Sequence, residues 1–364
     1  MRLRETIYRM SVQIKQLVPV FHKSHIENLV LMIVGIAHSR SVQLPRIAEH
    51  APVKKIQIES RVQRFERLLA CRQFIPLDVM QPVATQVLKH LSRSGEPLMI
   101  LMDRTMINDG LNLLYVSVGF CGRALPLGWR EVPHQGNSDL ALQKKLLGWL
   151  KECLPQGVEV FIVADREFHS IHLAGWIKLE MGVHFVLRIK AGTWIEIDGQ
   201  WCRAGEMASI GERRLWKDVR VTRDRKVEYR VNLLTVWERT EDEPWLLISD
   251  ADEAEEIEGV YKKRYWIEEM FSDHKRRGMN LEATRITDPK RVQRLLVAVA
   301  LAYLWTMEIG ALVVNTQQWR RVDNRGAKRS VSLCQVGLRW LREMLMQSLL
   351  PPAFTGQFRP VADG

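Results

Sequence analysis

Four residues that can act on phosphates stand at a fixed spacing: Tyr261, Arg264, Glu268 and Lys275. A helix turns by about 100° per residue, so these positions fall at about 0°, 300°, 340° and 320°. The spacing therefore predicts one helix that carries all four side chains on a narrow stripe. A carboxylate beside two cations and a phenol is typical of a metal site that binds phosphates. Taken alone, a solvated helix face with ordinary charge pairs explains the stripe better.

Two aspartates upstream each follow a short apolar stretch. Asp103 ends the stretch 98–103, and Asp165 ends the stretch 158–165. Neither stretch has a helical period, so both are predicted to be buried strands. Carboxylates at the ends of neighbouring strands can share metal ions, although an aspartate after a strand is more often a turn or a helix cap.

The elements around these aspartates have a recognisable order. We predict further strands over 111–120, 123–132 and 183–190, and helices from near Asn137 or Ser138 to about Cys153 and over 169–181. Asp109 and Gly110 predict the turn of a hairpin. Three meandering strands followed by alternating helices and strands is the order of a ribonuclease-H-like fold, an α/β fold with a mixed five-stranded sheet.

The chain divides into four predicted parts, of which residues 1–92 are the first. This part is helical, and a helix over 41–50 followed by a basic amphipathic helix over 58–72 has the outline of a helix-turn-helix DNA reader, though a plain helical bundle fits equally well. The ribonuclease-H-like domain takes 93–190 and 250–315, and a β-rich insertion interrupts it at 191–249. A helical segment, 316–364, ends the chain.

Composition narrows the class of partner. The chain has 364 residues, 46% of them apolar, and its 53 Lys and Arg against 42 Asp and Glu give a net charge of +11. This excess favours a nucleic acid over a membrane surface. The apolar run 295–314 contains Glu308, so we predict a buried core helix and no membrane span. The five scattered cysteines form no zinc or redox motif and indicate a reducing cytoplasm.

With these positions in view, the chain resembles the DDE transposases that carry the YREK signature, which belong to the IS-four group of bacterial insertion sequences. The resemblance covers about residues 95–285 and rests on three motifs: Asp103-Arg-Thr105, Asp165-Arg-Glu-Phe168 and the Tyr261-to-Lys275 spacing. It implies that Asp103, Asp165 and Glu268 are the catalytic residues and the ligands of two Mg²⁺ ions, for which Mn²⁺ can substitute. Carboxylates are the ligands that these hard cations prefer.

The resemblance also implies roles for five other residues. Tyr261, Arg264 and Lys275 would hold DNA phosphates near the cleaved end, Arg188 would contact DNA, and Trp245 would stack on a flipped base. For Trp245, packing in the core is the plain alternative.

The implied function is cut-and-paste transposition through a DNA hairpin, with cleavage at terminal inverted repeats and strand transfer into target DNA. A homodimer would assemble on the two ends of double-stranded DNA, at the nucleoid in the bacterial cytoplasm and without a membrane. Two alternatives stay open: a metal-dependent nuclease or resolvase without strand transfer, and a DNA-binding relic without catalysis.

Two neighbouring carboxylates compete with the proposed ligands. Glu167 can share the strand face of Asp165, and Glu269 lies about 100° from the stripe.

Overall fold

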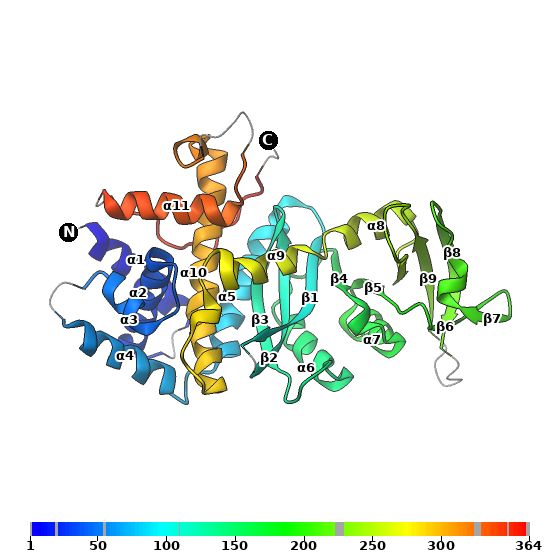
Figure 1. The fold of residues 1–364 in the computed structure, drawn as a ribbon, viewed down its shortest axis with the longest axis horizontal. Coiled ribbons are helices and arrows are strands. Elements are labelled where there is room, and N and C mark those ends of the chain that lie inside the picture. The colour runs from blue at the N-terminus through cyan, green and yellow to red at the C-terminus, as the bar shows by residue number, and fades with distance from the viewer. Residues whose placement is uncertain are drawn as a thin grey trace.

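A computed structural model describes residues 2–18, 21–53, 56–108, 110–222, 229–323, 329–347 and 349–361. The molecule is elongated (Figure 1). Its N-terminal and C-terminal helices lie at one end, the first strands of a sheet lie in the middle, and the strands of the insertion lie at the other end. Asp109, at which we predicted a hairpin turn, lies outside the described residues.

Five helices are described in the N-terminal part of the chain. They are α1 (Arg2–Leu17), α2 (Lys23–Ser39), α3 (Leu44–His50), α4 (Ile58–Ala70) and α5 (Pro76–Leu91). Residues 29–37 of α2 are all buried, so this helix is the centre of the group. In α4 only Phe65, Leu68 and Leu69 are buried, and its charged residues are exposed apart from Arg61, which donates to the carbonyls of Ala48 and Ile56.

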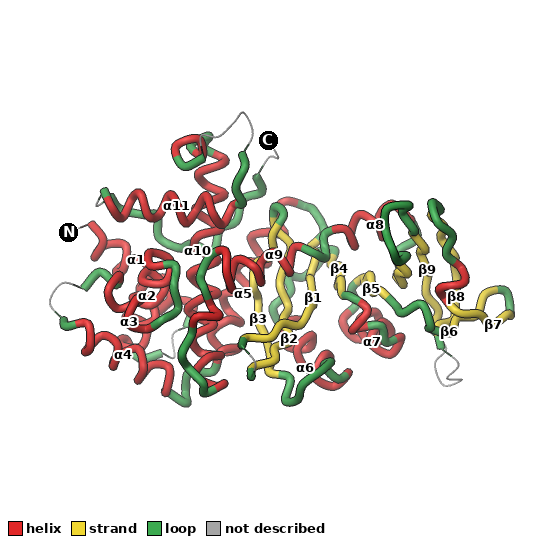
Figure 2. Tube along the Cα trace, viewed as in Figure 1, coloured by secondary structure: helices red, strands yellow, loops and turns green. Residues whose placement is uncertain are grey.

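The ten strands of the described chain form one mixed sheet in the order β3-β2-β1-β4-β5-β10-β9-β8-β6-β7. They are β1 (Leu98–Ile107), β2 (Leu111–Phe120), β3 (Arg123–Glu131), β4 (Val160–Ala164), β5 (His184–Arg188), β6 (Trp194–Ile197), β7 (Gln200–Arg203), β8 (Arg213–Val221), β9 (Arg230–Val236) and β10 (Trp245–Ser249). A mixed α/β fold with a large mixed sheet is thus confirmed, and Figure 2 shows the helices that flank it.

The prediction of a five-stranded sheet with a separate insertion is wrong in one respect. The five predicted strands are neighbours, but the sheet continues into the insertion because β10 pairs antiparallel with β5, with Leu247 opposite Arg188. The strands β9, β8, β6 and β7 then extend the same sheet. A strand that pairs with the edge of β5 places its side chains beside the end of β4, where Asp165 follows.

The register of β1 and β4 brings the two aspartates together. These strands are parallel, and their last paired residues are Met102 and Ala164. Asp103 directly follows Met102, and Asp165 directly follows Ala164. Asp165 follows β4 as predicted, but Asp103 does not end its strand, because β1 stays paired with β2 as far as Ile107.

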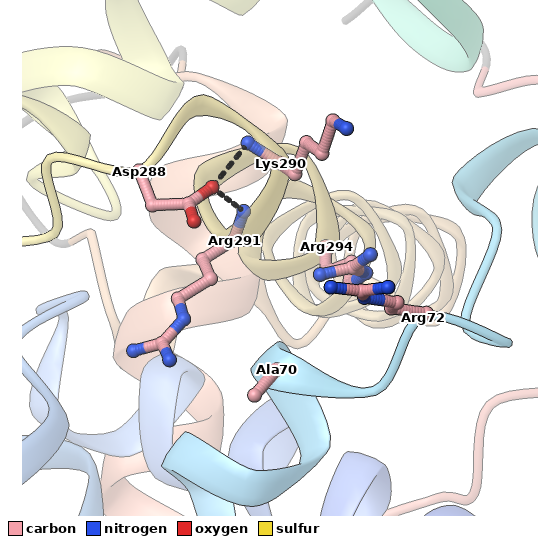
Figure 3. Close-up of a pocket in the computed structure, with 6 residues that line it drawn as sticks. All are labelled: Ala70, Arg72, Asp288, Lys290, Arg291 and Arg294. Atoms are coloured by element: carbon pink, nitrogen blue, oxygen red, sulfur yellow. Dashed lines mark hydrogen bonds between the residues drawn. The ribbon is translucent and has the colours of Figure 1, made fainter.

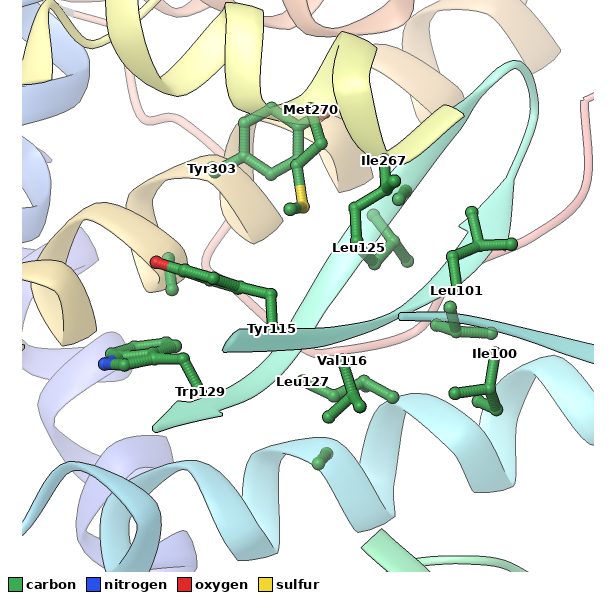
Figure 4. Packing of buried hydrophobic residues seen from close by; sticks show 14 of the residues in the cluster. Ile100, Leu101, Tyr115, Val116, Leu125, Leu127, Trp129, Ile267, Met270 and Tyr303 are labelled. Atoms are coloured by element: carbon green, nitrogen blue, oxygen red, sulfur yellow. The ribbon is translucent and has the colours of Figure 1, made fainter. Parts of the chain in front are cut away.

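Helices cover both faces of the sheet. They include α6 (Leu140–Lys151), α7 (Ile171–Trp176), α8 (Ala254–Lys262) and α9 (Trp266–Ser272), with π-helical turns η3 (Ile177–Met181) and η5 (Asp273–Arg277). In Figure 4, Ile267 and Met270 of α9 approach β1–β3 from one face, with Tyr303 behind them and Tyr115 stacked on Trp129 below. The helix on the opposite face is α5. Short 3-10 turns are η1 (Ser92–Ser94), η2 (Arg166–Phe168), η4 (Ala204–Met207), η6 (Leu281–Ala283) and η7 (Trp319–Arg321).

The long apolar helix is α10 (Pro289–Asn315), which packs against α2 and against α11 (Leu333–Met346). It is long and apolar enough to cross a membrane, but 89% of its most apolar window is buried inside the protein. Glu308 accepts hydrogen bonds from the backbone N–H groups of Thr355 and Gly356, at 2.9 Å and 3.3 Å. The C-terminal segment therefore satisfies the carboxylate that the apolar run carries, as in a core helix.

Candidate functional site

Three carboxylates converge beside the end of β4, and each comes from a different element. Asp103 lies on β1, Asp165 follows β4, and Glu268 lies on α9. Each aspartate accepts a hydrogen bond from the next backbone N–H, Asp103 from Arg104 at 2.7 Å and Asp165 from Arg166 at 2.6 Å. These bonds orient both side chains, which follow the last paired residues of the neighbouring strands β1 and β4.

The carboxylates are close enough to affect one another. Burial, the largest cause, and the charges of Glu268 and Asp165 together raise the pKa of Asp103 to about 6, against the lowering effect of the Arg104 N–H and Arg264. The side chain of Asp103 is only 19% exposed, whereas that of Glu268 is 54% exposed. A half-buried cluster of like charges is a place that a cation stabilises.

Arg264 provides a positive charge inside this cluster. Its Nη1 lies 3.7 Å from Oδ2 of Asp103, and its Nη2 donates a hydrogen bond to Oε1 of Glu268. Burial lowers the pKa of Arg264, but the nearby Tyr261, Asp165 and Glu268 raise it more, so it lies above its usual value. One guanidinium therefore links two of the three carboxylates and stays charged.

Tyr261 and two predicted DNA contacts line the other side of Asp165. The Tyr261 hydroxyl donates to Oδ1 of Asp165 at 3.4 Å, and burial raises the pKa of Tyr261 to about 12. Arg188 is near enough to lower the pKa of Tyr261, and its Nη2 lies 3.5 Å from Oε2 of Glu243. Trp245 packs edge-on against Tyr261, with ring centroids 5.1 Å apart. The half-buried Trp245 is thus in the wall of the site.

Lys275 does not join this group in the structure. It lies in the π-helical turn η5, half-buried, where burial lowers its pKa, Glu282 raises it and Arg276 lowers it. No described ion pair connects Lys275 with the three carboxylates.

The prediction of one continuous helix over Tyr261–Lys275 is wrong. Helix α8 ends at Lys262, a turn over 263–265 follows, and α9 begins at Trp266. The π-helical turn η5 then changes the angle between successive side chains. Tyr261, Arg264 and Glu268 still converge, because Arg264 lies in the turn between the two helices.

The competing carboxylates have other partners. Glu167 accepts hydrogen bonds from Nε of Arg104 at 3.0 Å and from the backbone N–H of Ser138 at 3.0 Å. Glu269 pairs with Arg123 at 3.0 Å and with Arg277 at 3.2 Å. Each is thus paired with an arginine outside the three-carboxylate group. Sequence reasoning missed Arg104 and Arg123, because an isolated arginine gives no signal of the carboxylate it will meet in the fold.

The donor set suits a hard divalent cation, since all three candidate ligands are carboxylates. In the described residues, however, no three His, Cys, Asp or Glu side chains lie close enough to hold one metal ion together. The guanidinium of Arg264 lies against both Asp103 and Glu268, so a cation of the protein itself stands between these two carboxylates.

Comparison with known proteins gives one family. Residues 123–305, half of the chain, match the sequence model of the family described as "Transposase DDE domain". Those residues include Asp165 and Glu268 but not Asp103. No curated protein sequence matches the chain. Among solved structures, the chain is similar to piggyBac transposase in a cryo-EM synaptic complex with hairpin DNA. That likeness has 13% identity and a TM-score of 0.44, and it covers 95% of this chain and 78% of that one.

Proposed function

The chain belongs to the transposase DDE domain family, and from this premise we propose that it is a DNA transposase with the catalytic residues Asp103, Asp165 and Glu268. In this proposal the enzyme cleaves phosphodiester bonds at transposon ends and joins the released 3′-ends to target DNA. The observation that carries the proposal is the convergence of these carboxylates from β1, the end of β4 and α9. The proposed catalytic fold is ribonuclease-H-like, supported by the strand order β3-β2-β1-β4-β5.

The proposed ligands of two Mg²⁺ ions are the same three carboxylates, and Mn²⁺ can substitute. Two such ions activate the attacking oxygen and neutralise charge on the leaving oxygen of a phosphodiester. Asp103 and Asp165 would provide an oriented pair, because each accepts a hydrogen bond from the next backbone N–H and their strands are neighbours. Glu268 completes the set from a more exposed position on a short helix.

Arg264 has two proposed roles that exclude each other in time. In the described structure it neutralises Asp103 and Glu268. If cations occupied the carboxylates, Arg264 would be free to bind a DNA phosphate through two parallel hydrogen bonds. It lies in the turn before α9, outside both helices.

The remaining proposed contacts surround Asp165. Arg188 and Tyr261 lie together there and offer a guanidinium and a hydroxyl to a phosphate. Trp245 packs beside them, so a base extruded from the duplex could stack on its ring. Lys275 is proposed to contact DNA farther along the strand, since its environment does not include the carboxylates. These assignments follow the YREK resemblance.

Within this proposal the protein is the transposase that moves an insertion sequence of the IS-four group. It would act at terminal inverted repeats by a cut-and-paste route with a DNA hairpin, as a homodimer assembled on the DNA ends at the nucleoid in the cytoplasm.

Isosteric substitutions test the catalytic carboxylates. Asp103→Asn, Asp165→Asn and Glu268→Gln should each abolish Mg²⁺-dependent cleavage of the ends of the element that encodes the chain, while duplex binding persists. Glu269→Gln is the matched control, since it removes the adjacent carboxylate, which faces Arg123 and Arg277 instead. Retained cleavage in any of the three variants removes that residue from the catalytic set.

A joining assay separates the transposase from its alternatives. Pre-cleaved ends with free 3′-hydroxyls, incubated with Mg²⁺ and a supercoiled plasmid, should give covalently joined products. Cleavage without joining would identify a nuclease, and binding with neither reaction would identify a non-catalytic DNA-binding protein.

A further inference from the structure

A cavity of about 600 Å³ lies between the end of α4 and the start of α10, far along the chain from the carboxylates. Four cations line it, and we call it the basic cavity: Arg72, Lys290, Arg291 and Arg294, with Ala70 and Asp288. We propose that the basic cavity is a second DNA contact, which binds backbone phosphates of the duplex away from the cleaved end. This inference rests on the proposed function.

The charge of the basic cavity is not balanced by the protein. Asp288 is the only carboxylate among its lining residues, against four cations. In the described part of the chain, none of the four cations makes an ion pair with a carboxylate within 4.0 Å. A polyanion would supply the missing negative charge.

Arg294 is the strongest indication of a ligand, because its side chain is buried. It is 9% exposed, and it donates from Nε to the carbonyl of Phe74 at 3.0 Å and from Nη1 to the carbonyl of Leu69 at 2.7 Å. Both partners are neutral, and Nη2 has no acceptor in the described residues. The charge of Asp288 interacts with Arg294, but no carboxylate hydrogen-bonds the guanidinium, so a bound anion would add a direct charge-assisted hydrogen bond.

In the basic cavity, side chains rather than the backbone N–H groups at the start of α10 are available to bind a phosphate. Oδ1 of Asp288 caps α10 by accepting from the backbone N–H groups of Lys290 at 2.8 Å and Arg291 at 3.1 Å. The first amides of the helix are therefore occupied. In Figure 3 the side chains of Arg72 and Arg294 lie in the same space between the two elements, where their planar groups can bind a phosphate through paired hydrogen bonds.

The lining favours a nucleic-acid backbone over a nucleotide. It contains no aromatic ring on which a base could stack and no apolar pocket for one, only an alanine and charged side chains. Figure 1 shows that α10 begins beside the end of α4 at one edge of the molecule, whereas α8 and α9 lie nearer the middle of the sheet. Phosphates bound at the basic cavity would be different from those at the carboxylates, so one duplex can contact both.

The test removes the exposed cations and leaves the buried Arg294 in place, so that the fold is preserved. The variant Arg72→Gln/Lys290→Gln/Arg291→Gln is compared with Lys144→Gln/Lys145→Gln/Lys151→Gln, which removes the same charge from α6. Binding of a fluorescent duplex that carries a transposon end is measured by anisotropy between about 50 and 200 mM KCl, a range in which phosphate contacts dominate the salt dependence.

Each lost phosphate contact should lower the slope of log affinity against log salt by about 0.9. We expect the basic-cavity variant to lose two to three such contacts, a weakening on the order of tenfold to several-hundredfold at about 0.1 M salt. The α6 variant should change much less. Equal weakening in both variants, or none in either, would overturn the basic cavity as a DNA contact.

Two further readouts separate the sources of phosphate and the two levels of the proposal. Inorganic phosphate and a mononucleotide are tested for raising the melting temperature of the wild type but not of the basic-cavity variant. A rise in the melting temperature of the wild type alone, together with unchanged duplex binding by the variant, would assign the cavity to a free phosphate compound and refute the DNA contact. A wild type that binds no duplex at low salt would refute the proposed function itself. A wild type that binds and cleaves, together with an unaffected cavity variant, would refute only the cavity.

Discussion

The ion pair between Arg123 and Asp273 gives the sharpest stability prediction, because it anchors the helix that carries Glu268. Arg123 opens β3, and its Nε lies 3.0 Å from Oδ2 of Asp273, just beyond the end of α9. The Asp273 side chain is 1% exposed. Oδ1 of Asp273 has no hydrogen-bond partner in the described residues. Oδ2 of Asp273 also accepts a hydrogen bond from the Tyr303 hydroxyl at 3.5 Å. The substitution Arg123→Met keeps most of the packing and removes the charge.

The structure sets the size of the effect. Removing one partner of a buried ion pair leaves an uncompensated charge and costs about 3–5 kcal/mol. Arg123→Met also breaks the pair with Glu269, but that side chain is 28% exposed, so this part adds at most about 1 kcal/mol. Arg277→Met is the control, because it breaks only the exposed pair with Glu269 and should cost about 1 kcal/mol or less.

The pH dependence has a definite sign. Burial raises the pKa of Asp273, and Arg123 holds it down. Without Arg123 the folded-state pKa rises further above the unfolded value. A carboxyl with a raised folded pKa loses stability as pH rises through that value, so the deficit of Arg123→Met should be larger at about pH 7.5 than at about pH 5.

Urea unfolding followed by tryptophan fluorescence measures these differences at both pH values. A double-mutant cycle with Asp273→Asn should give a coupling energy of about 2–3 kcal/mol, since the two residues interact directly. A cost for Arg123→Met no larger than that of Arg277→Met, or a deficit that grows at acid pH, would refute a buried charge pair as the anchor of α9.

Three further changes probe other parts of the core. A Cβ at Gly337 would lie 1.9 Å from a carbonyl oxygen of α10, so Gly337→Ala should lower the free energy of unfolding by about 1–3 kcal/mol or more in urea. Gly148→Ala is the control: its Cβ would meet no atom within 4 Å, so this change should be neutral or stabilising by up to about 1 kcal/mol. Because Glu308 accepts backbone hydrogen bonds from residues 355–357, Glu308→Ala should expose that segment to limited proteolysis before the core unfolds. Burial lowers the pKa of His274 to about 3, so His274 stays neutral in the folded state as pH falls below about 6.5, while it is protonated in the unfolded state. The free energy of unfolding should therefore fall by up to about 1.4 kcal/mol per pH unit. His274→Phe should remove this slope in urea unfolding series at acid pH.

Much of the sheet was predictable because its strands have local signals. The apolar stretches before Asp103 and Asp165 became β1 and β4, and the strands after them follow the predicted order as far as β5. The continuation of the sheet through β10 was not predictable, because it depends on pairing between Leu247 and Arg188, which are far apart in the sequence. A local pattern shows that a segment is a strand and does not show which edge it joins.

The same limit explains the surfaces that sequence reasoning missed. The basic cavity joins Arg72, just after α4, with Arg294, in α10, through carbonyls of residues 69 and 74. Its basic residues are visible in the sequence as two short groups, but only the packing of α10 against α4 combines them. Arg123 and Asp273 are likewise 150 positions apart, and each is unremarkable in its own segment.

The stripe from Tyr261 to Lys275 shows how a spacing can predict a site while its geometry is wrong. A continuous helix would have placed Arg264 on the same face as Glu268 and Lys275, and no proline or glycine lies between them to indicate a break. The chain breaks there nevertheless: Tyr261, before the break, is buried against Trp245 and Asp165, and Ile267 and Met270, after it, are buried on the sheet. Arg264 lies in the turn over 263–265, between Asp103 and Glu268. The first three signature residues thus converge although the helix is broken, and Lys275, which follows the second irregularity at η5, is the one that lies apart.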